Sequence, residues 1–443
     1  MTLEQRAPRD VTARDVTAPG AQIRRSGMRA FAASRVGGLP RSFWALWSGT
    51  LVNRVGYMVE PFLAYYLTGV RGLSLAVTGA VLAMSGAGSV VSQLVAGSLA
   101  DRIGRRATLT LGMVANAGAL VGLGYARTLV AIMTATLLFG ATIDIYRPAS
   151  SALVADLVPP AERPRAYGLL FWAVNLGFSV AMVLGGTLAR AGFRWLFWVD
   201  AVTCVAFAVI VWRAVPADHP RRERRARGRV TPAEAGRRAA LASRAGKLRD
   251  VARDGVMIAY LALTLCYCLV YLQAYTTLPL AMRLRGMPPQ AYGLAMAVNG
   301  VLIVALQPVV SAWLGRRNRT IVLAAGFVLV GLGFGLTAVA TSVIAYGLTV
   351  GVWTLGEIVT AGIGAAIVAD LAPAHMRGRY SGAYGATWSA AYLLGPLAGT
   401  RLLALGAPVL WVSCAGLSAL AAAGLLALGP AISQRARYLD TQP

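Results

Sequence analysis

The chain repeats its own sequence pattern at a constant offset of 214 residues, without insertions in the shared register. The matching positions carry glycines, arginines and polar residues, which seldom coincide by chance in so apolar a chain: Arg71 recurs as Arg285, Gly79 as Gly293, Gln93 as Gln307, Arg105 as Arg319, Asp156 as Asp370 and Arg163 as Arg377. Solenoid repeats are much shorter, at about 20–50 residues. A duplication of this length instead indicates a membrane protein built from two related halves with a site between them.

The composition of the chain is that of a membrane protein. Hydrophobic residues make up 57% and charged residues only 13%, against about 25% charged in an ordinary soluble domain. Charge-poor stretches recur, each near the ~20 residues that a membrane-spanning helix needs. The sequence predicts twelve spans, at 43–66, 76–99, 107–126, 129–157, 167–188, 193–212, 256–279, 291–314, 320–340, 344–371, 380–404 and 407–427. We therefore expect an all-α membrane protein, with two pseudo-symmetric six-helix bundles at 43–212 and 256–427.

The placement of basic residues predicts the orientation of these spans. The formal net charge is +25, and most of the 42 Lys and Arg residues lie in alternate connecting segments and in the two tails, 1–42 and 428–443. Positively charged segments stay on the cytoplasmic side of a membrane. We therefore expect a multi-pass protein of the cell (inner) membrane with both termini cytoplasmic. The tail 1–42 is polar and arginine-rich, and we expect it to be disordered.

The longest basic segment is the linker at 213–255, which the same rule places in the cytoplasm. Its arginines could bind anionic lipid headgroups, or they could serve only as a topology signal on a solvated tether. Nucleic acid is disfavoured as a partner, because no zinc-finger spacing or RNA-reading aromatic motif accompanies the arginines.

No motif points to an enzyme, a cofactor or a metal. The chain has four cysteines, all inside predicted spans, and two histidines, and it lacks a Walker phosphate loop, a zinc-binding histidine pair and a Ser-His-Asp set. Thiols inside membrane spans act as small apolar side chains. We therefore expect neither enzymatic activity nor a bound cofactor or metal.

The segment after the second predicted span resembles the signature of the major facilitator superfamily. It reads Gly97-Ser-Leu-Ala-Asp101-Arg102-Ile-Gly104-Arg105-Arg106, in the loop between the second and third spans where that family carries it. The resemblance implies a conformational latch that joins the cytoplasmic ends of the two halves and helps to switch between inward- and outward-facing states. The copy in the second half keeps Arg316 and Arg319 but has no aspartate.

Further motifs are similar to those of twelve-span bacterial drug:proton antiporters. They are Arg147-Pro148-Ala149, Ala155-Asp156-Leu157-Val158-Pro159, Asn175-Leu-Gly177, and Glu357 together with Arg377-Gly378-Arg379-Tyr380. Two features depart from the antiporter pattern. Ala181-Met182 stands in place of the Gly-Pro pair of the fifth span, and the arginine early in the fourth span is absent from 137–140.

The resemblance implies a secondary active transporter that moves a small amphipathic drug or metabolite by alternating access. It also implies outward transport coupled to protons, with the proton gradient as the energy source, and a monomer as the working unit. One alternative is a proton-coupled uptake symporter of the same fold. Another is a non-transporting membrane scaffold or sensor, against which the latch motif and Glu357 argue.

Six ionisable residues lie inside predicted spans, where a charge is costly and marks a functional candidate. They are Arg54, Glu60, Asp144, Arg147, Asp200 and Glu357, and none has a charged counterpart 214 positions away. Charges that only supported a shared framework would occur in both halves, so the asymmetry indicates a site for an asymmetric substrate. Asp200, near the outer membrane face, is expected to be a structural anchor.

Glu357 is the leading candidate for proton coupling. It lies mid-span with no basic residue within helical reach, and burial without a charged partner favours the protonated carboxyl. The alternative is a structural Glu357 that donates one hydrogen bond between helices. Asp144 is the second proton-coupling candidate, and Arg147 shares its helical face. That pair could serve coupling or substrate binding, or it could only fix packing, and Pro148 is expected to kink the span beside it.

The remaining candidate cavity residues come from the first and tenth spans. Asn53, Tyr57 and Glu60 are spaced at i, i+4 and i+7, which predicts one polar stripe along a helix. Glu60 could instead reach the outer interface, and Arg54 lies on the neighbouring stripe. Trp353 suits a cavity for an aromatic compound, or it could serve ordinary helix packing.

Overall fold

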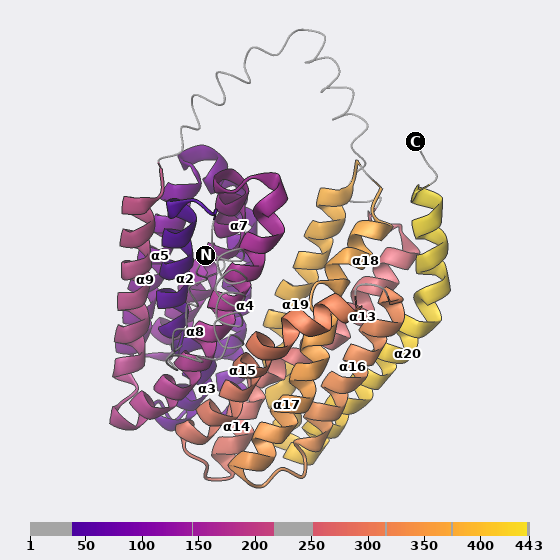
Figure 1. The fold of residues 1–443 in the computed structure, drawn as a ribbon. Helices are drawn as coiled ribbons and strands as arrows, with labels where there is room; N and C mark the ends of the chain where they lie inside the picture. The colour runs from indigo at the N-terminus through magenta and orange to yellow at the C-terminus, as the bar shows by residue number, and fades with distance from the viewer. Residues whose placement is uncertain (1–37, 144, 217–250, 315–316, 374, 441–443) are drawn as a thin grey trace, which may run out of the picture. The chain divides into compact units, whose positions relative to one another are not determined.

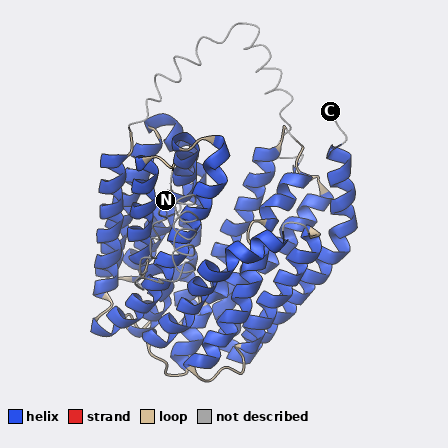
Figure 2. Ribbon diagram, in the orientation of Figure 1, coloured by secondary structure: helices blue, strands red, loops and turns tan. Residues whose placement is uncertain are grey.

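The computed structural model describes residues 38–143, 145–216, 251–314, 317–373 and 375–440. Only the backbone is described at 94–98, 101, 147–148, 311–312 and 440. Every regular element in the described ranges is helical (Figure 2). Residues 1–40 form one unit and residues 41–443 another, and the helices α2 (Arg41–Val55) to α20 (Ala407–Asp440) all belong to the second.

The helices follow the predicted spans in both halves of the chain (Figure 1). The first half contains α2 (Arg41–Val55), α3 (Val59–Gly69), α4 (Leu75–Ile103), α5 (Arg105–Tyr125), α6 (Leu129–Ile143), α7 (Tyr146–Leu157), the turn η1 (Pro160–Glu162), α8 (Arg163–Ala191) and α9 (Arg194–Ala214). The second half contains α13 (Gly255–Tyr271), the turn η2 (Leu272–Ala274), α14 (Thr277–Leu284), α15 (Pro289–Leu314), α16 (Arg319–Leu336), α17 (Val343–Thr360), α18 (Ile363–Leu371), α19 (Arg377–Leu405) and α20 (Ala407–Asp440). Helix α20 continues well past residue 427, so the predicted tail begins as helix.

Four of the predicted spans consist of two successive helices. The first is interrupted between α2 and α3, the fourth between α6 and α7, the seventh between α13 and α14, and the tenth between α17 and α18. Gly362 has φ +77° at the last interruption, in the left-handed region that glycine adopts without strain. The interruption of the fourth span lies where Pro148 predicts a kink. The breaks fall at equivalent places in the two halves, as the internal repeat requires.

Nine helices in the described parts of the chain are long and apolar enough to cross a membrane. Three of the twelve predicted spans are not among them. The first and fourth are divided by their breaks into shorter helices, of which Leu129–Ile143 is apolar but short. The eleventh corresponds to α19, whose sequence is rich in glycine, alanine and tyrosine.

The internal repeat reappears as matching close contacts between the two halves. A Cβ on Gly79 of α4 would lie 3.0 Å from the carbonyl oxygen of Pro396 in α19, and one on Gly293 of α15 would lie 2.2 Å from that of Met182 in α8. Gly293 and Pro396 each follow their counterparts, Gly79 and Met182, by the same 214 positions. Because a Cβ 2.2 Å from a backbone oxygen is not accommodated, glycine at position 293 allows α15 to lie directly against α8.

A second set of matching contacts lies within each half. Arg105 forms an ion pair with Asp156, and Arg319 forms one with Asp370, again at equivalent positions. All four side chains are at least one-third exposed, and exposed ion pairs stabilise a fold by only about 0–1 kcal/mol. These pairs therefore orient the ends of helices more than they stabilise the fold.

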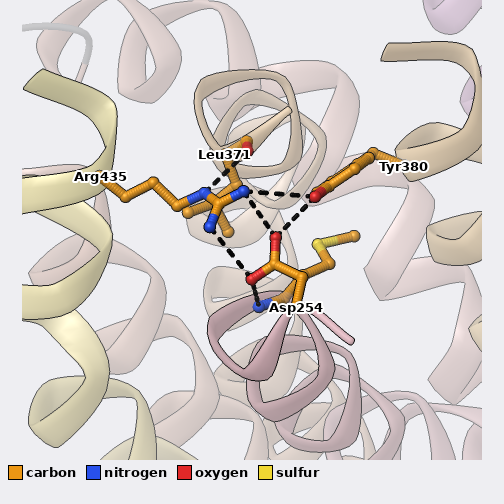
Figure 3. Close-up of polar contacts among 5 residues, drawn as sticks. Asp254, Leu371, Tyr380 and Arg435 are labelled. Atoms are coloured by element: carbon orange, nitrogen blue, oxygen red, sulfur yellow. Dashed lines mark hydrogen bonds and ion pairs between the residues drawn. The ribbon is translucent and has the colours of Figure 1, made fainter. Parts of the chain in front are cut away.

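A charged cluster in the second half centres on the buried Asp254, whose counterpart 214 positions earlier is Pro40. Asp254 caps α13 by accepting the backbone N–H of Met257 at 3.2 Å, and its carboxylate also accepts the hydroxyl of Tyr380 at 2.6 Å. Arg435 of α20 pairs with the same carboxylate at 2.8 Å and donates to the carbonyl oxygen of Leu371 at 3.2 Å. Figure 3 shows these contacts converging on Asp254, so the cluster joins α13, α18, α19 and α20 at one point.

Gly293→Ala is expected to lower the free energy of unfolding by about 1–3 kcal/mol, because the added methyl group forces α15 away from α8. Gly122→Ala is the matched control, since nothing lies within 4 Å of a Cβ at that position of α5. The control should be neutral or more stable by up to ~1 kcal/mol. Unfolding of the purified protein in mixed detergent micelles measures both, and equal stability of the two variants would contradict the role of Gly293.

Candidate functional site

A cavity of about 840 Å³ lies between helices of the two halves. Its wall includes side chains of α4 and α8 from the first half and of α13, α15, α17 and α19 from the second. The volume falls within the range of about 300–1,000 Å³ that is usual for small-molecule sites. Among the described residues, three charged side chains line this central cavity: Arg54, Glu60 and Glu357.

Glu357 lies on α17 at the wall of the central cavity and is held by two neutral donors. The hydroxyl of Tyr271 donates to Oε1 at 2.8 Å, and Nδ2 of Asn299 donates to Oε2 at 2.7 Å. Asn299 is itself buried and also contacts Thr354 at 3.0 Å. The carboxyl group is therefore fixed in orientation from α13 and α15. In the described part of the chain it forms no ion pair, and it accepts two hydrogen bonds where the structural alternative predicted that it donates one.

The first span presents Arg54, Tyr57 and Glu60 to the central cavity. The guanidinium group of Arg54 lies over two aromatic rings, 5.0 Å from the centroid of Tyr57 and 4.8 Å from that of Tyr146, an attractive arrangement of cation and π-system. The Tyr57 hydroxyl donates to the Glu60 carboxylate. Glu60 thus lines the cavity beside Tyr57, although the two residues do not belong to one continuous helix.

Asn53 and Trp353, two other candidate cavity residues, lie elsewhere. Asn53 is buried and donates to Sγ of Cys204 at 3.3 Å. Asn53 does not share a face with Tyr57 and Glu60, because helix α2 ends at Val55 and the residues after it no longer follow the same helical path. Trp353 is fully buried, stacks on Phe334 at 5.6 Å, and meets Tyr271 edge-on at 6.1 Å. It supports the wall from behind, which is the packing alternative.

Asp200 binds the backbone at the break between α2 and α3, which is a structural role. It is buried, and its Oδ2 accepts the backbone N–H of Val59 at 3.2 Å, at the first residue of α3. The thiol of Cys204 lies 3.8 Å from Oδ1. A helix N-terminus has unpaired N–H groups and a partial positive charge, both of which a carboxylate satisfies.

Part of the predicted site lies outside the described residues. Asp144 is one such residue, and only the backbone is described at Gly97, Asp101 and Arg147. The remaining latch residues are described: Arg102 is exposed, Gly104 links α4 to α5 with φ +91°, Arg105 pairs with Asp156, and Arg106 lies 4.2 Å from the ring centroid of Trp212.

Sequence reasoning missed the neutral residues that shape the site. Asn299, Tyr384 and Trp388 all line the central cavity, yet an inventory of charges inside spans passes over them. Asn299 had a detectable signal, since it is an amide side chain in the middle of the apolar stretch 291–314. Tyr384 and Trp388 had none, because aromatic side chains at helical spacing also occur in ordinary packing.

The sequence and fold have known relatives. The family model described as Major Facilitator Superfamily matches residues 46–396. An uncharacterized MFS-type transporter, YttB of Bacillus subtilis, is 26% identical over 370 residues, covering 82% of this chain and 89% of the relative. The Na(+), Li(+), K(+)/H(+) antiporter of Planococcus maritimus is 23% identical, covering 78% and 85%. The multidrug resistance protein MdtH of Aeromonas salmonicida is 24% identical, covering 76% and 82%.

Solved structures of peptide transporters have a similar fold. A POT family transporter in complex with a thioalcohol-conjugated peptide superimposes with a TM-score of 0.73 at 15% identity, covering 90% of this chain and 98% of that one. At this identity the likeness concerns the fold alone. The family match over most of the chain and the long apolar helices lead to one conclusion: the chain belongs to the Major Facilitator Superfamily and is an integral membrane transporter, not an enzyme.

Proposed function

We propose that this chain is a proton-coupled secondary transporter that moves a small amphipathic drug or metabolite out of the cell by alternating access. The observation that carries the proposal is Glu357, a carboxyl group at the wall of the central cavity whose two oxygens accept hydrogen bonds from Tyr271 and Asn299. Relatives named as a multidrug resistance protein and as a cation/proton antiporter support it.

In this proposal twelve spans form two six-helix bundles that rock about the central cavity, and the motif at 97–106 latches their cytoplasmic ends. The presence of helices in each of the twelve predicted ranges supports the span count. The contacts of α4 with α19 and of α8 with α15 support a seam between the bundles. The protein lies in the inner membrane as a monomer with both termini cytoplasmic, and its linker 213–255 contacts anionic lipid headgroups.

The coupling step follows from the energy of a charge in a closed cavity. An ionised Glu357 opposes closure of the helices over it, because an uncompensated charge in the membrane interior is costly. A proton on the carboxyl, or a positively charged or hydrogen-bonding group of the substrate beside it, removes that obstacle. Since one carboxyl group cannot hold both at once, proton entry and substrate exit alternate. Asp144 is the second proton-coupling group in this proposal.

A second candidate is the exchange of a monovalent metal cation for protons, which the name of the Planococcus relative favours. An uptake symporter would use the same cavity but would move the solute in the same direction as the proton. Vesicles of known orientation, with an acidic interior that contains a pH-sensitive dye, separate the three. Alkalinisation of the interior on addition of drug supports the antiporter, and alkalinisation on addition of NaCl supports the metal exchanger. Entry of protons together with an added solute supports the symporter. A scaffold would give no substrate-induced signal.

Glu357→Gln is expected to abolish proton-driven flux while leaving folding intact, since glutamine keeps the shape and the acceptor for Tyr271 but cannot exchange a proton. Glu357→Asp should retain partial flux, because the charge is kept and withdrawn by one methylene. Uphill transport in proteoliposomes measures both. Glu162→Gln removes the charge of an exposed carboxylate in η1 that pairs with Arg165 at the start of α8; it is the control and should transport normally. Wild-type flux in Glu357→Gln would move the coupling site elsewhere, with Asp144 as the next candidate.

Asp101→Asn and Arg102→Ala are expected to slow the transport cycle without reducing the amount of protein in the membrane. The reason is that both residues belong to the proposed latch, and Arg102, whose side chain is described, does not line the central cavity. Transport rate and membrane expression should be measured on the same cells. Unchanged rates in both variants would remove the latch from the proposed mechanism.

Single cysteines placed in the linker 213–255 should be protected from a membrane-impermeant thiol reagent in intact cells. A cysteine at Arg127, between α5 and α6, should be labelled, because the proposed topology puts that loop outside. Permeabilised cells provide the control in which both sites react. Labelling of the linker in intact cells would reverse the proposed orientation.

A further inference from the structure

The two halves meet along one face of α15, which packs on α8. A Cβ built on Gly186 of α8 would lie 2.9 Å from Cα of Gln290, and Gly293 also packs on α8. Trp172 of α8 donates to the carbonyl oxygen of Val304 at 3.1 Å. Residues 290, 293 and 304 are separated by close to whole numbers of helical turns, so they share one face of α15. This α8–α15 seam therefore begins at Gln290, in the first turn of α15.

The amide of Gln290 is buried at the start of the seam without a hydrogen-bond partner. Neither Oε1 nor Nε2 bonds to any residue in the described parts of the chain, and both atoms are shielded from solvent. The buried amide of Gln273 shows the usual arrangement, since it donates to the carbonyl oxygen of Gly395 at 3.2 Å and accepts the hydroxyl of Thr277 at 2.8 Å. A polar group that leaves water and forms no new hydrogen bond destabilises the state that buries it. The closed seam is therefore less stable than it would be with an apolar side chain at position 290.

Two contacts between the halves hold this end of the seam closed, where α3 lies beside α14 (Figure 1). The hydroxyl of Tyr65 in α3 donates to the carbonyl oxygen of Met287, just before α15, at 3.2 Å. The rings of Phe62 and Tyr292 meet edge-on with centroids 5.4 Å apart, an arrangement that aromatic pairs prefer. The unpaired amide acts against these attractive contacts.

Separation of α8 from α15 reverses the effect of the amide. Because Gln290 lies at the end of the seam and its backbone faces Gly186, parting of the helices there gives its amide access to water. The amide has two N–H donors and an acceptor oxygen with two lone pairs, and water satisfies all of them. The free energy that opposes burial in the closed state is thus absent from the open state.

We propose that Gln290 sets the balance between the closed and open states of the α8–α15 seam, through an amide that is unpaired only when the seam is closed. The proposal rests on the proposed function, in which the two halves rock about the central cavity. The populations of two states depend on the difference in their free energies. A residue that weakens the closed state keeps the open state populated and so allows the cycle to continue.

The reactivity of a thiol behind the seam measures the open population. Val174→Cys places a thiol on α8 at the wall of the central cavity, and in the proposed topology an external reagent reaches it only through the open seam. The full-length protein is labelled in right-side-out vesicles with a membrane-impermeant maleimide, without substrate or a proton gradient. When opening is faster than the reaction, the labelling rate follows the open population. Protein without Val174→Cys gives the background of the native cysteines.

Gln290→Met keeps the length of the side chain and removes the amide. External labelling should slow roughly 5- to 100-fold, because the closed state no longer buries an unpaired polar group. Gln434→Met makes the same substitution at an exposed position of α20 and is the matched control, expected to label at the wild-type rate. Tyr65→Phe removes a hydrogen bond across the seam and should label roughly 2- to 10-fold faster.

The sign of the change in Gln290→Met decides the proposal. A glutamine that held the seam closed would loosen it when replaced, so faster or unchanged labelling overturns the proposal. Labelling from inside-out vesicles should not slow, because the cavity stays accessible from the other side when the seam is closed. If Gln290→Met is recovered unfolded, Gln290→Leu takes its place, with the same expected sign and the same contrary result.

Failure of the proposed function gives a different result. Absence of external labelling in every variant, with normal labelling from inside-out vesicles, would reject the rocking of the halves and the role of Gln290 with it. Labelling from both sides without a slower rate in Gln290→Met would reject the role of Gln290 alone. Normal proton-driven flux in Glu357→Gln would reject only the proton site, since the labelling rates depend on neither substrate nor proton gradient.

Discussion

Interrupted helices inside a membrane are the constraint on which the site depends, because backbone N–H and C=O groups in hydrocarbon must be satisfied within the protein. The first break meets this requirement through Asp200, which accepts the N–H of Val59 at the start of α3. The break in turn decides which side chains reach the central cavity. Tyr57 and Glu60 line it, whereas Asn53, just before the break, is buried against Cys204.

Symmetry and its loss divide the molecule into framework and site. Gly79 and Gly293, and the ion pairs of Arg105 and Arg319, make equivalent contacts in the two halves. The charges at the central cavity have no such counterparts, since the residue 214 positions before Glu357 is Ile143. Duplication thus supplies the helices and the seam between them, and later divergence supplies a cavity whose two walls differ in charge.

The positions of the helices and the family could be predicted from the sequence, because they depend on apolar length and on motif spacing. Glu357, selected as a rare charge inside a span, lies at the wall of the central cavity. The details of the wall could not. Helical spacing placed Asn53 with Tyr57, but the intervening break is set by a tertiary contact to Asp200. Trp353 was ambiguous because burial behind Tyr271 and exposure to a cavity leave the same pattern in a sequence. Asn299 was overlooked because it carries no charge.

The cluster around Asp254 links the start of the second half to the end of the chain. Asp254 caps α13, whereas its partner Arg435 lies in α20, 181 residues later in the chain. Removal of one partner from a buried ion pair lowers the free energy of unfolding by about 3–5 kcal/mol. The chain therefore contains α13 before Arg435 can pair with Asp254, and without Arg435 this carboxylate keeps only the described hydrogen bonds from Tyr380 and from the N–H of Met257.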